Sequence, residues 1–164
     1  MGDFASLFGL LVSVIGFGFT LFQLHRTKAV AEAAKNAADQ MQEKLRNLDT
    51  VMDFSSVITM MEDIKRHHRG DNWFILPDRY SALRIKLAAI KATHTNLTDN
   101  QQTVLQSAIQ QFKDMEGTVE RALAKKSTPN NFPKLNEIVS TEIDKLSEVL
   151  TEIKNQMEVT NYGR

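Results

Sequence analysis

The chain is organised by one apolar stretch, residues 4–24, which reads FASLFGLLVSVIGFGFTLFQL. The stretch contains no charged side chain; Asp3 precedes it, and His25 and Arg26 follow it. A helix of these 21 residues is about 31 Å long, which matches the hydrocarbon core of a bilayer. We therefore expect residues 1–25 to form a helix that crosses a membrane once.

The flanking charges predict the orientation of this segment. Arg26, Lys28 and Lys35 follow it, whereas Asp3 is the only charged side chain before it. Because basic residues stay on the cytoplasmic side, we expect the N-terminus outside and the rest of the chain in the cytoplasm. A secretory signal peptide is the alternative, but such peptides begin with positive charge and have a shorter apolar core.

Small and polar residues form one stripe along this predicted helix. At alternating spacings of three and four residues, they are Ser6, Gly9, Ser13, Gly16, Thr20 and Gln23. Small residues let helices approach closely, and hydroxyl and amide groups form hydrogen bonds between helices in lipid. The stripe fits either packing of two helices or a pore, in which four or more copies turn it toward a central axis and line a narrow conduit.

The same seven-residue register continues beyond the membrane segment. Its positions are Thr27, Val30, Ala34, Ala37, Met41, Lys44, Leu48 and Val51, which are small or apolar except for Thr27 and Lys44. A 3.5-residue period sustained over many heptads is typical of a parallel coiled coil. We expect a continuous helix with a stalk at residues 26–50, and a homo-oligomer of four or more copies. The alternative is that residues 29–48 pack on the chain's own domain.

Residues 51–160 predict a cytoplasmic four-helix bundle, because apolar residues recur at helical spacing and no stretch alternates as a strand does. The expected helices cover about 50–66, a segment after Pro77, 98–126 with a capping box at Thr98-Asp99-Asn100-Gln101, and Pro133 to about Val159. The last two should pair as an antiparallel hairpin, and residues 161–164 should fray. The expected fold class is all-α.

Each expected bundle helix has one apolar face. The inward positions are Phe54, Val57, Ile58, Met61 and Ile64; then Tyr80, Leu83, Leu87 and Ile90; then Leu105, Ile109, Phe112, Met115, Val119 and Leu123; and finally Leu135, Ile138, Ile143, Leu146, Leu150, Ile153 and Met157. Faces of this kind bury themselves against one another. We expect them to form one core.

Composition and motifs argue against an enzyme. The chain has no cysteine, which excludes thiol nucleophiles and sulfur-ligated zinc, and its formal net charge is zero. The four histidines, His25, His67, His68 and His94, lack the spacing of a two-histidine metal clamp. The chain contains neither a glycine-rich phosphate loop nor a Gly-x-Ser-x-Gly elbow. We expect no catalytic residue, no metal and no cofactor.

The strongest candidate for a binding site is the basic stretch from Lys65 to Lys91. The stretch contains only two acidic residues, Asp71 and Asp78, and its net charge is therefore +5. Its seven cationic residues are Lys65, Arg66, Arg69, Arg79, Arg84, Lys86 and Lys91. With His67, His68 and the aromatic Trp73, these groups suit phosphate contacts and base stacking. The alternatives are solvated cations at a helix end, a lid of Trp73 and Phe74 on the core, or contact with anionic lipid.

The architecture resembles the short membrane effectors of bacterial anti-phage defence. A stripe of glycine and serine in one membrane helix, an Ala-rich charged stalk and a small helical bundle are similar to the channel effector of the Hailong system and to the membrane pore protein of some type VI CRISPR systems. The Arg-x4-6-His motif of the second family has no match here. The first resemblance implies an ion channel kept closed by an oligonucleotide that a partner nucleotidyltransferase makes, with ligand sensing at 65–84 and ion passage at 6–23.

These observations lead to one hypothesis and one alternative. The hypothesis is a homo-oligomeric pore in a bacterial inner membrane, gated by a nucleotide or oligonucleotide that the bundle senses. The alternative is a non-conducting membrane anchor whose bundle docks a protein partner.

Overall fold

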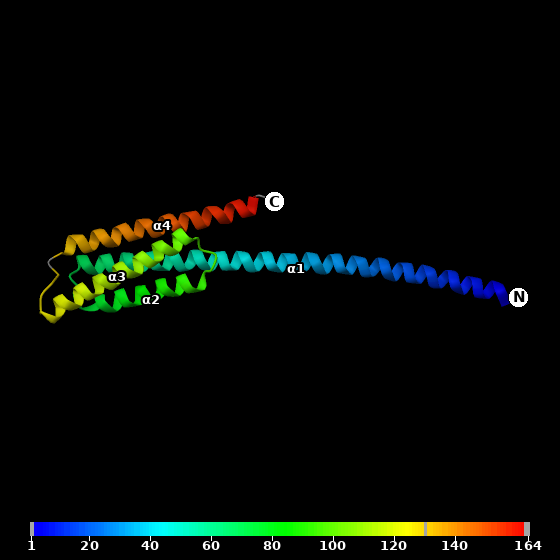
Figure 1. The fold of residues 1–164 in the computed structure, drawn as a ribbon, viewed down its shortest axis with the longest axis horizontal. Helices are drawn as coiled ribbons and strands as arrows, with labels where there is room; N and C mark the ends of the chain where they lie inside the picture. Colours follow the sequence, from blue (N-terminus) through cyan, green and yellow to red (C-terminus); the bar gives the residue numbers. More distant parts are fainter. Residues whose placement is uncertain (1, 130, 163–164) are drawn as a thin grey trace. The chain divides into compact units, whose positions relative to one another are not determined.

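The computed structural model describes the backbone of residues 2–129 and 131–162 and the side chains of residues 16–20, 22–23, 26–28, 30–129 and 131–158. In chain order its elements are α1 (Gly2–Arg69), the 3₁₀ helix η1 (Trp73–Ile75), α2 (Leu76–Thr93), α3 (Asp99–Ala124) and α4 (Phe132–Tyr162), as drawn in Figure 1. The described backbone contains no strand. The predicted all-α fold class is confirmed.

The chain divides into two compact units, Met1–Leu45 and Arg46–Arg164. The first unit consists of the N-terminal part of α1. The second is a helical bundle made of the remainder of α1 together with η1, α2, α3 and α4.

Helix α1 is longer than expected. The sequence predicts one helix to about residue 50 and a second over 50–66, but the structure joins them without a break. Residues 45–56, LRNLDTVMDFSS, contain neither Gly nor Pro, so nothing interrupts the hydrogen-bond ladder there. The helix ends in a Schellman turn, in which Asp71 has a φ of 53° and the Asn72 N–H donates to the His67 carbonyl at 3.0 Å.

The starts of α2 and α3 follow their sequence signals. Pro77 lies in the first turn of α2. The predicted capping box opens α3, because the Gln101 N–H donates to Thr98 Oγ1 at 3.3 Å and the Thr98 N–H donates to Gln101 Oε1 at 3.0 Å. The Gln101 side chain also donates to Glu152 Oε2 at 3.0 Å, which fastens this end of α3 to α4.

Within the bundle, consecutive helices run in opposite directions (Figure 1). Helix α3 packs against both α2 and α4, and its contact with α2 is the more extensive of the two. The expected hairpin of the last two helices therefore forms, but α3 has its larger interface with the helix before it.

The buried faces of the first three bundle helices largely match the expected ones. Exceptions are Ile58, Ile109 and Leu123, which are only partly buried. In α4 the buried face is rotated from the expected one: Val139, Glu142 and Val149 are buried, whereas Ile138 and Ile143 lie partly buried at its edges. The rotation brings an acidic residue into the core-facing row.

The described side chains of the first unit are not covered by the rest of the chain. Every described side chain between Gly16 and Arg46 is exposed. The predicted membrane segment at 4–24 lies mostly among residues whose side chains are outside the described set. In the part of the chain that the structure does describe, none of the helices has an apolar run long enough to cross a bilayer.

Candidate functional site

The basic cluster at the end of α1 is partly neutralised along its own helix. Arg66 lies 3.1 Å from Asp63 Oδ1, and His67 Nε2 lies 3.3 Å from Asp63 Oδ2. Lys65 Nζ lies 3.7 Å from Glu62 Oε1. These exposed or half-exposed pairs are weak. They reduce the positive charge that the sequence alone suggests for this surface.

Arg84 is a link between helices. Its guanidinium lies 2.6 Å from Glu116 Oε2, so the pair joins α2 to α3. The Arg84 Nε is buried and has no hydrogen-bond partner among the described residues. Arg84 is thus engaged in a contact between two helices of the bundle.

His68 lies in the core and joins three helices. It is fully buried; Nδ1 lies 2.9 Å from Asn136 Oδ1 on α4, and Nε2 hydrogen-bonds with the Tyr80 hydroxyl on α2. Burial lowers the pKa of the His68 imidazole below its usual range and raises the pKa of the Tyr80 hydroxyl. Both groups are therefore held neutral as parts of a buried hydrogen-bond network.

Trp73 closes this network from the side of η1. It is 4% exposed and stacks on His68 with ring centroids 5.4 Å apart, while Phe132 lies edge-on to both rings. This burial does not favour the predicted roles of His68 and Trp73 in ligand binding, since little of either ring is exposed for a base to stack on. The lid alternative holds for Trp73 but not for Phe74, which is 85% exposed.

Two cations of the predicted set remain available to a ligand. Arg69 and Arg79 are exposed, and neither forms an ion pair with the residues that the structure describes. They lie on either side of Phe74 in the sequence. Guanidinium groups and an exposed ring retain the chemistry of phosphate binding and base stacking.

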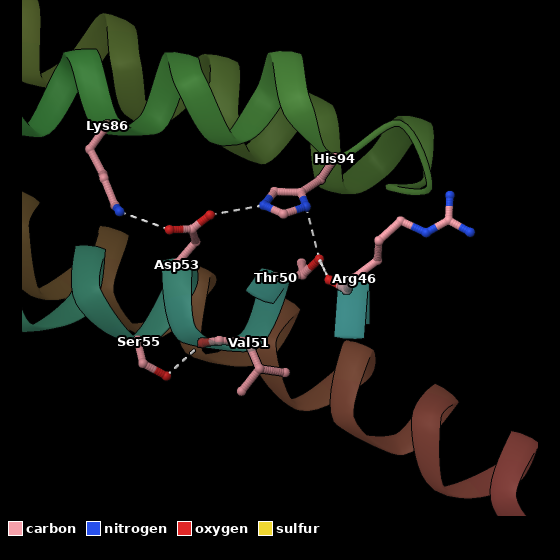
Figure 2. Close-up of polar contacts among 7 residues, drawn as sticks. All are labelled: Arg46, Thr50, Val51, Asp53, Ser55, Lys86 and His94. Carbon is pink, nitrogen blue, oxygen red and sulfur yellow. Dashed lines mark hydrogen bonds and ion pairs between the residues drawn. The ribbon is translucent and has the colours of Figure 1, made fainter. Parts of the chain in front are cut away.

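A second polar cluster, which we call the junction, joins α1 to the end of α2 (Figure 2). Asp53 on α1 accepts a hydrogen bond from Lys86 Nζ at 2.7 Å, and its other oxygen lies 3.0 Å from His94 Nε2. His94 Nδ1 lies 2.9 Å from Thr50 Oγ1, and the Thr50 hydroxyl is 2.9 Å from the Arg46 carbonyl. The hydrogen bond from Lys86, followed by that from His94, lowers the pKa of the Asp53 carboxyl.

His94 connects two positions of α1 within the junction. Its Nδ1 hydrogen-bonds with Thr50 and its Nε2 with Asp53, and because His94 is only 7% exposed, both contacts are confined to the interface of α1 with the end of α2. Thr50 Oγ1 also donates to the Arg46 carbonyl, so the junction includes a hydrogen bond within α1.

Sequence reasoning missed the junction because its partners are far apart. His94 is 41 residues from Asp53 and 44 from Thr50. The only signal in the sequence is a histidine directly after a helix, between that helix and the Thr98 capping box. Periodicity finds apolar faces, and it does not pair the polar groups between them.

The predicted pore stripe is described only in its second half. The side chains of Ser6, Gly9 and Ser13 lie outside the described set, whereas Gly16, Thr20 and Gln23 are exposed. Thr20 Oγ1 donates to the Gly16 carbonyl at 2.8 Å, so its hydroxyl proton is used within α1. A Cβ added at Gly16 would meet no atom within 4 Å. These positions are open to a neighbouring molecule.

The described side chains offer no group of three His, Asp or Glu residues placed to hold a metal ion. Searches of protein-family models, of curated proteins and of solved structures found no match to this chain. Its function must therefore be argued from its own residues, and the resemblance to defence effectors stays a hypothesis.

Proposed function

We propose that this chain is a homo-oligomeric pore of a bacterial inner membrane, gated by a ligand at its cytoplasmic bundle. In this proposal Phe4 to Leu24 crosses the membrane once with the N-terminus outside, and four or more copies turn the stripe from Ser6 to Gln23 toward a shared axis. The ligand is a nucleotide or oligonucleotide made by a partner nucleotidyltransferase, and the role is anti-phage defence.

The observation that carries the proposal is the continuity of α1 from Gly2 to Arg69. One uninterrupted helix includes the stripe, the stalk and the first helix of the bundle. A helix resists bending and twisting because each turn is hydrogen-bonded to the next. In this proposal, a rotation imposed on α1 at the bundle reaches the stripe through this one helix.

The bundle offers both a receiver and a connection for such a signal. Arg69 and Arg79, with exposed Phe74 between them in the sequence, suit a phosphate-bearing ligand. The junction of Asp53, Lys86 and His94 ties α2 to α1 through charge-assisted hydrogen bonds. Movement of α2 on ligand binding would pull on α1 near the start of the bundle.

A conductance experiment with matched glycine variants tests the pore. The full chain is reconstituted in planar bilayers and recorded with and without short oligonucleotides, alongside Gly16→Leu and Gly18→Leu. Both glycines are exposed with no atom within 4 Å of an added Cβ, but only Gly16 lies on the stripe. We expect discrete conductance that Gly16→Leu abolishes, that Gly18→Leu retains, and that oligonucleotides modulate.

The opposite result favours the anchor. Silence from inserted, folded protein, or equal conductance in both glycine variants, would contradict the pore. Phe74 and Ile85 are large apolar side chains that remain 85% and 68% exposed on the bundle, and they favour a docked protein partner in that case. Substitutions at these two positions would then affect activity most.

A further inference from the structure

The large exposed apolar side chains of α1 between Val30 and Met52 lie on a row that repeats every eleven residues. Val30, Met41 and Met52 are 11 residues apart, and all three are exposed. Ala34 and Leu45 repeat the same interval, as do Ala37 and Leu48. Together they form one row, which we call the eleven-residue stripe: Val30, Ala34, Ala37, Met41, Leu45, Leu48 and Met52.

The structure distinguishes this stripe from the seven-residue register. The two registers agree from Val30 to Met41 and then diverge, because a seven-residue repeat continues through Lys44 and Val51. Lys44 is charged, and Val51 is half-buried against the bundle core. Leu45 and Met52 are instead 54% and 69% exposed. The bundle therefore uses Val51 and leaves Met52 unpartnered within the chain.

We propose that the eleven-residue stripe is a self-association surface, on which a second copy of this chain packs parallel and in register. Eleven residues over three turns give about 3.67 residues per turn, close to the 3.6 of an undistorted helix. The resulting coiled coil is nearly straight with a slight right-handed twist. The inference deepens the proposed function, on which it rests for the presence of several copies in one membrane.

The charges beside the stripe favour a parallel partner. Lys44 precedes Leu45 on one edge of the stripe, and Asp49 follows Leu48 on the other edge. They are five residues apart, the separation at which edge positions of two parallel helices meet. In register, Lys44 of each copy therefore lies beside the partner's Asp49, whereas an antiparallel pair brings like edges together.

The remaining charges do not oppose this packing. At 100° per residue, Glu32, Asp39 and Glu43 fall on the face of α1 opposite the stripe. All three are exposed. The stripe is thus bordered by one complementary pair and is otherwise free of buried charge.

Disulfide cross-linking tests the register directly. The chain has no cysteine, so a single introduced cysteine can cross-link only to the same position of another copy. Leu45→Cys and Met52→Cys, with Lys44→Cys and Val51→Cys as neighbouring controls, are oxidised in full-length protein in membranes. We expect covalent dimers to form several-fold faster at 45 and 52 than at 44 and 51.

Charge exchange is the second arm. In the Leu45→Cys background, Lys44→Glu or Asp49→Lys alone should slow cross-linking, and the double exchange should restore it. No rescue would overturn the parallel pairing of these two residues. Fastest cross-linking at 44 and 51 would overturn the eleven-residue register, and none at any position would overturn the surface itself.

The outcome is separate from that of the pore. Conductance from protein that does not cross-link along the stripe would overturn this inference and leave the proposed function standing. Strong cross-linking at 45 and 52 in protein that never conducts would support the self-association surface and contradict the pore.

Discussion

The bundle and the N-terminal part of α1 differ in where their side chains find partners. In the bundle, even the polar groups His68, His94 and Gln101 are buried and hydrogen-bonded across helices. Before Arg46, every described side chain is exposed, and the hydroxyls of Thr20 and Thr27 bond only to carbonyls of their own helix. Helices in proteins gain most of their stability from packing. The side chains of the bundle thus find their partners within the chain, whereas the described side chains before Arg46 are suited to an external partner.

Two leucines give the sharpest test of this comparison. Leu83 in the bundle is fully buried, whereas Leu45 is 54% exposed. We expect Leu83→Ala to lower the free energy of unfolding of the bundle by about 2–5 kcal/mol, because it leaves a cavity. Leu45→Ala should change it by less than about 0.5 kcal/mol. Denaturant titrations of the full chain in detergent measure both, and equal losses would contradict the division into two regions.

The junction provides an intermediate effect. His94→Ala removes a buried imidazole that hydrogen-bonds with Asp53 and Thr50, and we expect a loss of about 1–3 kcal/mol. His67→Ala is the matched control: it removes only a half-exposed pair with Asp63, which is worth less than about 1 kcal/mol. The same unfolding titrations compare the two. A smaller loss for His94 than for His67 would show that the junction does not hold α1 to α2.

The smallest expected effect is a pH dependence of the folding stability of the bundle. Because burial lowers the pKa of His68, the unfolded chain takes up a proton that the folded chain resists. Stability should therefore fall as the pH drops below about 6.5, the usual pKa of histidine. Asp53 adds a second loss at lower pH, since its lowered pKa contributes stability that is present above the usual aspartate range and disappears as the carboxylate is protonated.

The His68 effect is isolated by one variant. His68→Gln should flatten the slope of stability between pH 7 and pH 5. An unchanged slope in the His68 variant would assign the pH dependence to another group.

Features encoded within a few neighbouring residues could be predicted from the sequence. The capping box at Thr98, the proline at the start of α2 and most of the apolar faces were of this kind. The break predicted near residue 50 is wrong. The stalk and the first bundle helix differ in their surroundings, but no helix-breaking residue separates them, and they form one helix. Long-range pairs such as Asp53 with His94 had no local signal.

Glu142 shows why the α4 face was misplaced. It occupies a core-facing row with Val139 and Leu146 and is 2% exposed, with one oxygen 2.7 Å from Lys145 Nζ. Hydrophobic periodicity assigns only apolar residues to a buried face. The predicted face of α4 therefore includes Ile138 and Ile143 and leaves out Glu142. The eleven-residue stripe that we propose differs from the predicted seven-residue register in the stalk, because that register continues through Lys44.

Trp73 is the only tryptophan in the chain, and it stacks on His68 inside the bundle. Its fluorescence consequently reports on the bundle and not on the structure of the stalk. The molecule thus carries its own optical probe, placed where bundle opening can be followed without a label.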